Sequence, residues 1–347
     1  MRISGFSHFA LGSCVTAALL AGCGALRQTQ GDMQPPIGGP GATTSSHHLY
    51  VADPGSGAIY RYALTNGLPQ TSPDEVFAKL PGVDYLGVDR EGHIYAAGSD
   101  SGGGFVQKFS AAGTLLGKIA LDTPVGSFAV DKDGFMYVAP EAYKDQAFTY
   151  SPKSFKTSGP AQPIATLTAE GGSTGPSEFI SIAADDEGRL YDAAYFGLNV
   201  FDHPRKTSSQ SATIGTPKGV WEPRFSGALA FDENNRIYAN IGYQDYCEGR
   251  KCRSYYWYLT DFDAILRGLG TGRKDRWIHG GDCSFDYSSY RNNGTVSGMA
   301  VFGGYLDAAC QGGTDGVWVY RADAFDRQHA VETLSGLTRP SDAKIGP

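Results

Sequence analysis

Residues 128–139 read FAVDKDGFMYVA, which is a short apolar run, a polar turn and a second apolar run. Val130, Phe135 and Tyr137 are residue types that favour a pleated, half-buried surface. The Asp133-Gly134 pair between the two runs is typical of the turn that joins two antiparallel strands. The stretch therefore predicts a β-hairpin.

The same pattern returns at three other places: LGVDREGHIYAA at 86–97, IAADDEGRLY at 182–191 and LAFDENNRIY at 229–238. The tyrosines of the second strand, at positions 95, 137, 191 and 238, are separated by 42, 54 and 47 residues. A repeat of that length built from short strands is typical of a propeller blade, because a helical repeat would show a period of about 3.6 residues. We therefore expect an all-β protein, a six-bladed β-propeller.

The first blade lacks its first strand on the amino-terminal side. Residues 49–53 match the second strand of the repeat, and residues 337–345 resemble the lead into a first strand. We predict that the carboxyl-terminal strand completes the first blade, which removes the unpaired edges of an open ring. Residues 260–296 lack the repeat, so we interpret them as part of an insertion at about 242–296, although a seventh blade there stays an alternative.

The repeated motif resembles that of NHL-repeat proteins and of the wider six-bladed group that includes the senescence-marker-protein/gluconolactonase relatives. The resemblance covers roughly residues 49–345. In propellers of this group, ligands bind at one mouth of the central channel, close to the residues that lead into each innermost strand. Carried onto this chain, the resemblance implies a ligand site that includes Asp84, Tyr85, Glu178, Arg224 and Asp342.

Two functions follow from this resemblance. The lactonase relatives hold a divalent metal with glutamate, asparagine and aspartate oxygens, as a hard cation such as Ca²⁺ prefers. Glu178 and Asp342 offer such oxygens, but the early Glu-Gly-Pro motif of those relatives does not occur in this chain. We therefore expect a non-catalytic binding or scaffold module without a cofactor, with a metal-dependent lactonase or esterase as the alternative.

The amino terminus predicts export. Arg2 precedes an apolar and small stretch that ends at residue 22, which is typical of a signal peptide rather than of a membrane-spanning helix. The four residues LAGC at 20–23 resemble the lipobox of bacterial lipoproteins, in which the cysteine is acylated after cleavage. We expect a signal peptide at 1–22, a lipid anchor at Cys23, a Pro/Gly/Ser/Thr tether at 23–47 and the propeller at 48–347, at the outer membrane or the periplasmic face of the envelope.

Four cysteines remain after the signal and the anchor: Cys247, Cys252, Cys283 and Cys310. An even number in an exported chain predicts two disulfides, for which three pairings are possible. The short spacing favours a Cys247–Cys252 bridge across a hairpin tip, which leaves Cys283 with Cys310. A zinc site is the alternative, but the sequence lacks a CxxC pair there.

The composition excludes a nucleic-acid partner. The chain has 29 Lys and Arg against 36 Asp and Glu, a net charge of −7. Nucleic-acid binders instead carry clustered Lys and Arg, and the single basic cluster, residues 273–276, is interrupted by an acid. We expect a monomer that contacts the membrane through its lipid and binds an unidentified protein or glycan.

Overall fold

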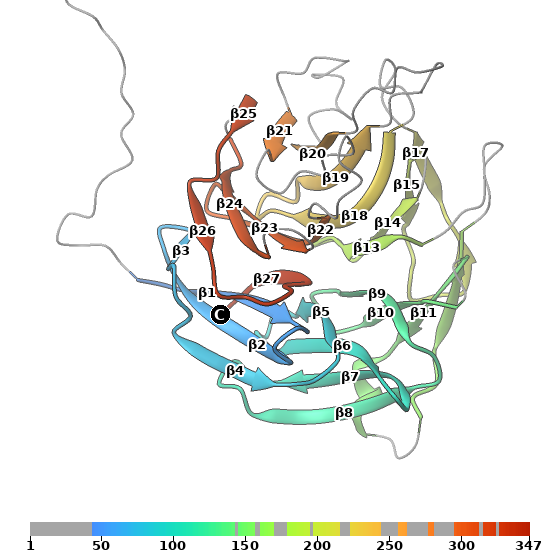
Figure 1. Ribbon diagram of the computed structural model, residues 1–347. Coiled ribbons are helices and arrows are strands. Elements are labelled where there is room, and N and C mark those ends of the chain that lie inside the picture. The colour runs from blue at the N-terminus through green and yellow to red at the C-terminus, as the bar shows by residue number, and fades with distance from the viewer. Residues whose placement is uncertain are drawn as a thin grey trace, which may run out of the picture. The chain divides into compact units, whose positions relative to one another are not determined.

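The computed structural model describes residues 44–142, 145–156, 160–169, 179–194, 197–215, 223–243, 256–261, 277–280, 295–311, 315–323 and 326–347. These residues form an all-β structure in which the strands group into six separate sheets of four or five strands. Figure 1 shows that β5, β9, β13, β18, β22 and β27 lie around a common centre, with the other strands of each sheet farther out. This is the arrangement of a β-propeller.

The sheets are numbered here by their order along the chain. Sheet 1 contains β1 (Thr44–Asp53), β2 (Ala58–Thr65), β3 (Leu68–Pro69), β4 (Glu75–Lys79) and β27 (Asp342–Gly346). Sheet 2 contains β5 (Val83–Val88), β6 (Ile94–Asp100), β7 (Gly103–Phe109) and β8 (Leu115–Leu121). Sheet 3 contains β9 (Val125–Val130), β10 (Met136–Pro140), β11 (Gln146–Tyr150), β12 (Ala165–Thr168) and β16 (Ser208–Ser209).

The other three sheets follow in the same way. Sheet 4 contains β13 (Ser181–Ala184), β14 (Leu190–Ala194), β15 (Gly197–Phe201) and β17 (Ala212–Gly215). Sheet 5 contains β18 (Pro223–Phe231), β19 (Ile237–Tyr243), β20 (Tyr256–Asp261), β21 (Trp277–Gly280) and β25 (Asp326–Gln328). Sheet 6 contains β22 (Thr295–Phe302), β23 (Tyr305–Gln311), β24 (Gly316–Arg321) and β26 (Glu332–Leu334).

Apolar side chains fill the space between neighbouring sheets. Because side chains alternate along a strand, Ile94 and Ala96 of β6 face sheet 1, whereas Tyr95 and Ala97 face sheet 3. Among the described residues the apolar side chains form six hydrophobic clusters, one at each junction from sheets 1 and 2 round to sheets 6 and 1. The ring is therefore held together by packing at every junction, including the junction between the last sheet and the first.

The carboxyl-terminal strand closes sheet 1, as predicted. β27 pairs antiparallel with β1, with Ala343 opposite Val51. The buried carboxylate of Asp53 accepts hydrogen bonds from the amides of Thr338 and Arg339 at 2.9 and 2.7 Å. The Tyr50 hydroxyl donates a hydrogen bond to the carbonyl of Pro347. β1 begins at Thr44, inside the stretch proposed as the tether.

A buried aspartate builds each of the four repeated turns. One oxygen of each of Asp89, Asp131, Asp185 and Asp232 accepts hydrogen bonds from the amides two and four residues later, at 2.8–3.0 Å. The residue three positions after the aspartate has a positive φ, which is why it is glycine in three turns and asparagine in the fourth. The first aspartate of the motif, rather than the Asp-Gly pair, therefore determines the turn.

These turns also contact one another from sheet to sheet. The amide of Arg90 donates to the carbonyl of Lys132 at 3.1 Å, and the Lys132 ammonium donates to the carbonyl of Asp186. The amide of Asp186 in turn donates to the side chain of Asn235 at 3.2 Å. The repeat therefore links sheets 2, 3, 4 and 5 along one face as well as shaping each hairpin.

Short parallel strands cover the outer edges of two sheets. β16 pairs with β12 of sheet 3, and β25 pairs with β21 of sheet 5. β21 lies within residues 260–296, so part of the predicted insertion is the fourth strand of sheet 5. The described part of that stretch forms no seventh sheet.

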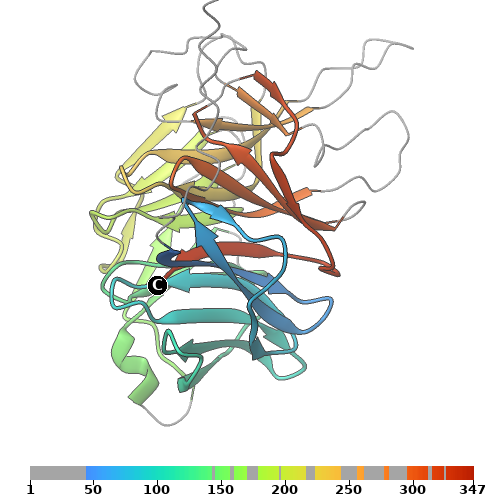
Figure 2. The ribbon, with the colours of Figure 1, turned by 90° about the vertical axis from the view of Figure 1, so that its left-hand side faces the viewer.

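The 3₁₀ helix η1 (Pro152–Lys156) is the coiled green ribbon in Figure 2, and it packs against β8. A Cβ atom at Gly117 would lie 3.0 Å from the ring of Phe155, so a side chain at position 117 would force that ring to shift. No helix among the described residues is long and apolar enough to span a membrane.

Candidate functional site

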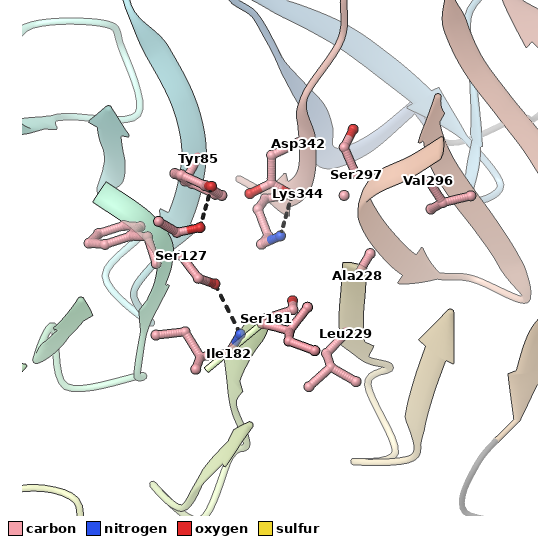
Figure 3. A pocket seen from close by; sticks show the side chains of 14 residues that line it. Tyr85, Ser127, Ser181, Ile182, Ala228, Leu229, Val296, Ser297, Asp342 and Lys344 are labelled. Carbon is pink, nitrogen blue, oxygen red and sulfur yellow. Dashed lines mark hydrogen bonds and ion pairs between the residues drawn. The ribbon is translucent and has the colours of Figure 1, made fainter. Parts of the chain in front are cut away.

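A cavity of about 260 Å³ lies at the centre of the ring (Figure 3). Every sheet contributes to its wall, in each case from the innermost strand or the residue just before it. The lining residues are Tyr85, Gly126, Ser127, Phe128, Ile180, Ser181, Ile182, Ala228, Leu229, Val296, Ser297, Gly298, Asp342 and Lys344. The wall thus combines apolar side chains with polar groups that converge from different sheets, an arrangement that can position a small molecule.

The two charged residues of the wall, Asp342 and Lys344, both come from β27. The Lys344 Nζ atom lies 2.7 Å from Asp342 Oδ1. The carboxylate also accepts hydrogen bonds from the amides of Leu86 and Ala343 at 2.9 and 2.8 Å. Burial raises the pKa of Asp342, and the neighbouring ammonium opposes that rise. The side chain of Lys344 is 29% exposed and that of Asp342 only 6%, so the ammonium is the more accessible charge.

Three hydroxyl groups of the wall are already tied to the backbone. Ser127 Oγ accepts a hydrogen bond from the amide of Ile182 at 3.1 Å, which joins sheets 3 and 4. Ser297 Oγ lies 3.2 Å from the carbonyls of Ala309 and Pro340 and donates its proton to one of them. The Tyr85 hydroxyl donates to the carbonyl of Gly126, and burial raises the pKa of that tyrosine. These bonds fix the positions of the polar groups around the cavity.

Gly298 sets how closely sheets 6 and 1 approach at the cavity. A Cβ atom at this position would lie 2.3 Å from Asp342 Oδ1 and 2.4 Å from its Cα atom. No other residue fits without moving β27. The closeness of the two strands therefore depends on the absence of a side chain at position 298.

The structure brings together only part of the predicted site. Tyr85 and Asp342 line the cavity. Asp84 does not: its carboxylate faces Arg339, 3.9 Å away, and burial raises its pKa. The backbone of Arg224 lies in β18 opposite Gly242, but its side chain is outside the described residues. Glu178 lies outside the described residues altogether.

Lys344 and Ser181 were absent from the predicted set. Asp342 and Lys344 are two apart in one strand, so the alternation of side chains places both on the same face. Once Asp342 is proposed as a site residue, this spacing therefore predicts Lys344 as well. For Ser181 the repeat itself was the signal, because Ser181 directly precedes its copy of the motif, as the cavity residues Tyr85 and Ser127 precede theirs.

One cluster of possible metal ligands lies elsewhere, in the turn between β5 and β6. Ligand atoms of Asp89, Glu91 and His93 all lie within 4.8 Å of one another. The oxygens of Asp89 already accept hydrogen bonds from this turn, from the Tyr95 hydroxyl and from Lys108. Although burial acts in the opposite direction, the bonds from His93 and Tyr95 lower the pKa of Asp89. The cluster is therefore best explained as the anchor of the turn.

Cys310 is the one candidate half-cystine within the described residues. It is buried in β23, in the cluster between sheets 5 and 6. Cys247, Cys252 and Cys283 lie outside the described residues, as does Cys23. The pairing of the cysteines therefore stays a prediction.

Comparisons with known proteins support the fold. No profile of a known protein family matches the chain, and no curated protein matches it by sequence. TolB from Acinetobacter baumannii has a similar structure, with a TM-score of 0.50, 8% sequence identity and coverage of 87% of this chain and 66% of that one. A protein of unknown function from Bacteroides caccae aligns with a TM-score of 0.47 and 14% identity over 86% of this chain and 98% of that one.

A calcium-binding protein, regucalcin from Agrobacterium tumefaciens, also aligns. Its TM-score is 0.37 and its identity 15%, over 57% of this chain and 66% of that one. At such identities the likeness to TolB shows a propeller fold and nothing about function.

Proposed function

We propose that this protein is a lipid-anchored extracytoplasmic β-propeller that binds its ligand without transforming it. In this proposal each of the six sheets is one blade. The main support is the cavity into which every sheet contributes a wall residue, because such convergence positions a ligand. In the same proposal, a protein or glycan partner binds the insertion around residues 242–296. Most of that insertion lies outside the described residues.

The charge next to Asp342 favours binding over metal-dependent hydrolysis. A divalent cation at this carboxylate would lie close to the Lys344 ammonium, 2.7 Å from the same oxygen, and the two positive charges would repel each other. Asp342 is also the one carboxylate among the described residues that line the cavity. A calcium site normally needs six to eight oxygen ligands.

A metal analysis tests this choice. We expect the full-length protein, purified without chelator, to carry no stoichiometric divalent ion and to melt at the same temperature with and without EDTA. Stoichiometric calcium, together with a melting temperature that falls on chelation, would instead support the lactonase. In that case Glu178 and Asp342 would be the first residues to replace.

The anchor is tested independently by cell fractionation. We expect Cys23→Ser to move the protein from the membrane fraction to the soluble fraction, because the acylated thiol is then missing. Cys14→Ser is the matched control, since residue 14 would leave with the signal peptide and its loss should change nothing. A Cys23→Ser protein that stays with the membrane would refute the lipid anchor.

A further inference from the structure

We propose that the ligand of the central cavity is a small oxyanion, a carboxylate or a phosphate, bound by Lys344, Ser127 and Ser181. This inference rests on the proposed binding function and specifies its ligand. Its basis is that some hydrogen-bond donors of the cavity wall are not fully used by contacts within the protein.

Lys344 has a donor that the protein engages only weakly. An ammonium group carries three N–H donors. Nζ lies 2.7 Å from Asp342 Oδ1 and 3.2 Å from the carbonyl of Ala343, which are good hydrogen bonds. The third contact, to the carbonyl of Met299, is 3.5 Å long and at the limit of a hydrogen bond. A ligand acceptor would therefore bind this N–H better than the protein does.

Two serine hydroxyls add donors of the same kind. Because Ser127 Oγ already accepts from the amide of Ile182, its own proton is directed elsewhere, and no acceptor for it is found among the described residues. The Ser181 hydroxyl likewise has no hydrogen-bond partner within the described part of the chain. Figure 3 shows Ser127, Ser181 and Lys344 around one open space, reached from sheets 3, 4 and 1.

The acceptors of the wall are less available. Both oxygens of Asp342 are occupied, by Leu86 on one side and by Ala343 and Lys344 on the other. The groups left over around Lys344 are therefore mainly donors, one of them charged. A ligand group that only accepts, and that carries a negative charge, satisfies all three. With about 260 Å³ available, the ligand is a small molecule rather than a peptide.

Calorimetric titration of the full-length protein tests the proposal. The probes are sodium acetate and sodium phosphate at an ionic strength matched with sodium chloride, and sorbitol as an uncharged compound. We expect acetate or phosphate to bind, and sorbitol and chloride not to bind. The anion that binds more tightly shows whether the site prefers a carboxylate or a phosphate. Lys344→Met should weaken that binding by roughly tenfold or more, as expected for a charged hydrogen bond.

Three variants make the result specific. Lys344→Arg keeps the charge and should keep most of the affinity, whereas Ser181→Ala should lower it several-fold. Lys153→Met, on η1 and away from the cavity, is the control for overall charge and should bind as the wild type does. Melting curves of all variants establish that each one is folded.

The outcomes separate this inference from the proposed function. Equal anion binding by the wild type and the Lys344→Met variant would overturn the oxyanion site. Binding of sorbitol but of neither anion, weakened by Ser181→Ala, would overturn the oxyanion while leaving a binding channel in place. If no probe binds and the metal analysis finds calcium, both the oxyanion and the non-catalytic function fail.

Discussion

Replacing Asp307 with asparagine is expected to raise the free energy of unfolding by about 4 kcal/mol at pH 7, with little change near pH 4. Asp307 lies in the middle of β23, between Ala300 of β22 and Val319 of β24. It points to the same side of the strand as Ala309, which belongs to the cluster between sheets 6 and 1. Both of its carboxyl oxygens are buried without a hydrogen-bond partner in the described structure.

The direction of the effect follows from the protonation of this group. Burial raises the pKa of Asp307 from its ordinary value to about 8. In the unfolded chain the carboxyl ionises near pH 4, whereas in the folded protein it keeps its proton up to about pH 8. Between these values the unfolded state releases a proton that the folded state retains, so stability falls by about 1.4 kcal/mol for each pH unit. Asparagine does not titrate, and the penalty disappears.

Urea unfolding of both proteins at several pH values between 4 and 8 measures this difference. The gap between the two stability curves should widen steadily with pH, because all other titrating groups are shared and cancel. Asp202→Asn, at an exposed carboxyl, is the matched control and should give a curve parallel to the wild type. Parallel curves for Asp307→Asn as well would mean that Asp307 is ionised in the folded protein.

Asp307 also illustrates why sheet 6 was harder to predict than the others. In sheets 2 to 5 the second strand carries a tyrosine whose hydroxyl can reach the motif aspartate, as in Tyr95 with Asp89 and Tyr137 with Asp131. In sheet 6 the turn is Gly303-Gly304, which needs no aspartate because both residues adopt a positive φ. The aspartate of this sheet stands instead within the strand, at a position where the sequence pattern predicts an apolar or aromatic residue.

The closure of the ring was predictable from the sequence because it depends on local pattern. Residues 49–53 lacked a first strand and residues 337–345 supplied one, and the pairing of β27 with β1 confirms this. The cavity was only partly predictable. Tyr85 and Asp342 follow from the repeat, but Asp84 turns to Arg339 because successive residues of a strand point to opposite sides. Which side faces the cavity depends on a local irregularity of pairing between Val83 and Tyr85, which the sequence pattern does not reveal.

Contacts between sheets were the least predictable feature, and Asp131 shows why they matter. Its carboxylate is buried and accepts hydrogen bonds from two amides of its own turn and from the Tyr137 hydroxyl at 2.7 Å. It also accepts from Arg205, a residue 74 positions later in the chain, whose Nη2 atom lies 2.7 Å away and bonds Asp133 at the same distance. One side chain therefore holds the hairpin of sheet 3 and connects it to a segment beyond β15 of sheet 4.

Asp131→Ala is accordingly expected to lower the free energy of unfolding by about 3 kcal/mol, mostly through the hydrogen bonds that lose their acceptor, because the Arg205 side chain is 35% exposed and water screens its ion pair. The loss exceeds that of a surface ion pair because the turn amides and the Tyr137 hydroxyl lose their acceptor while remaining largely buried. Urea unfolding of this variant, with Asp202→Ala as the exposed control, measures the effect. A loss below 1 kcal/mol would mean that the turn is held by its backbone alone.

Arg205→Ala separates the two roles of Asp131. This variant removes the contact with the segment between β15 and β16 but leaves the turn hydrogen bonds, so it should lose less than Asp131→Ala does. In the double variant the two losses should not add, because the ion pair can be broken only once. Strict additivity would instead mean that Asp131 stabilises only its own hairpin. Sheets 3 and 4 would then be held together by apolar packing, such as that of Phe179 against Phe201 and Leu167.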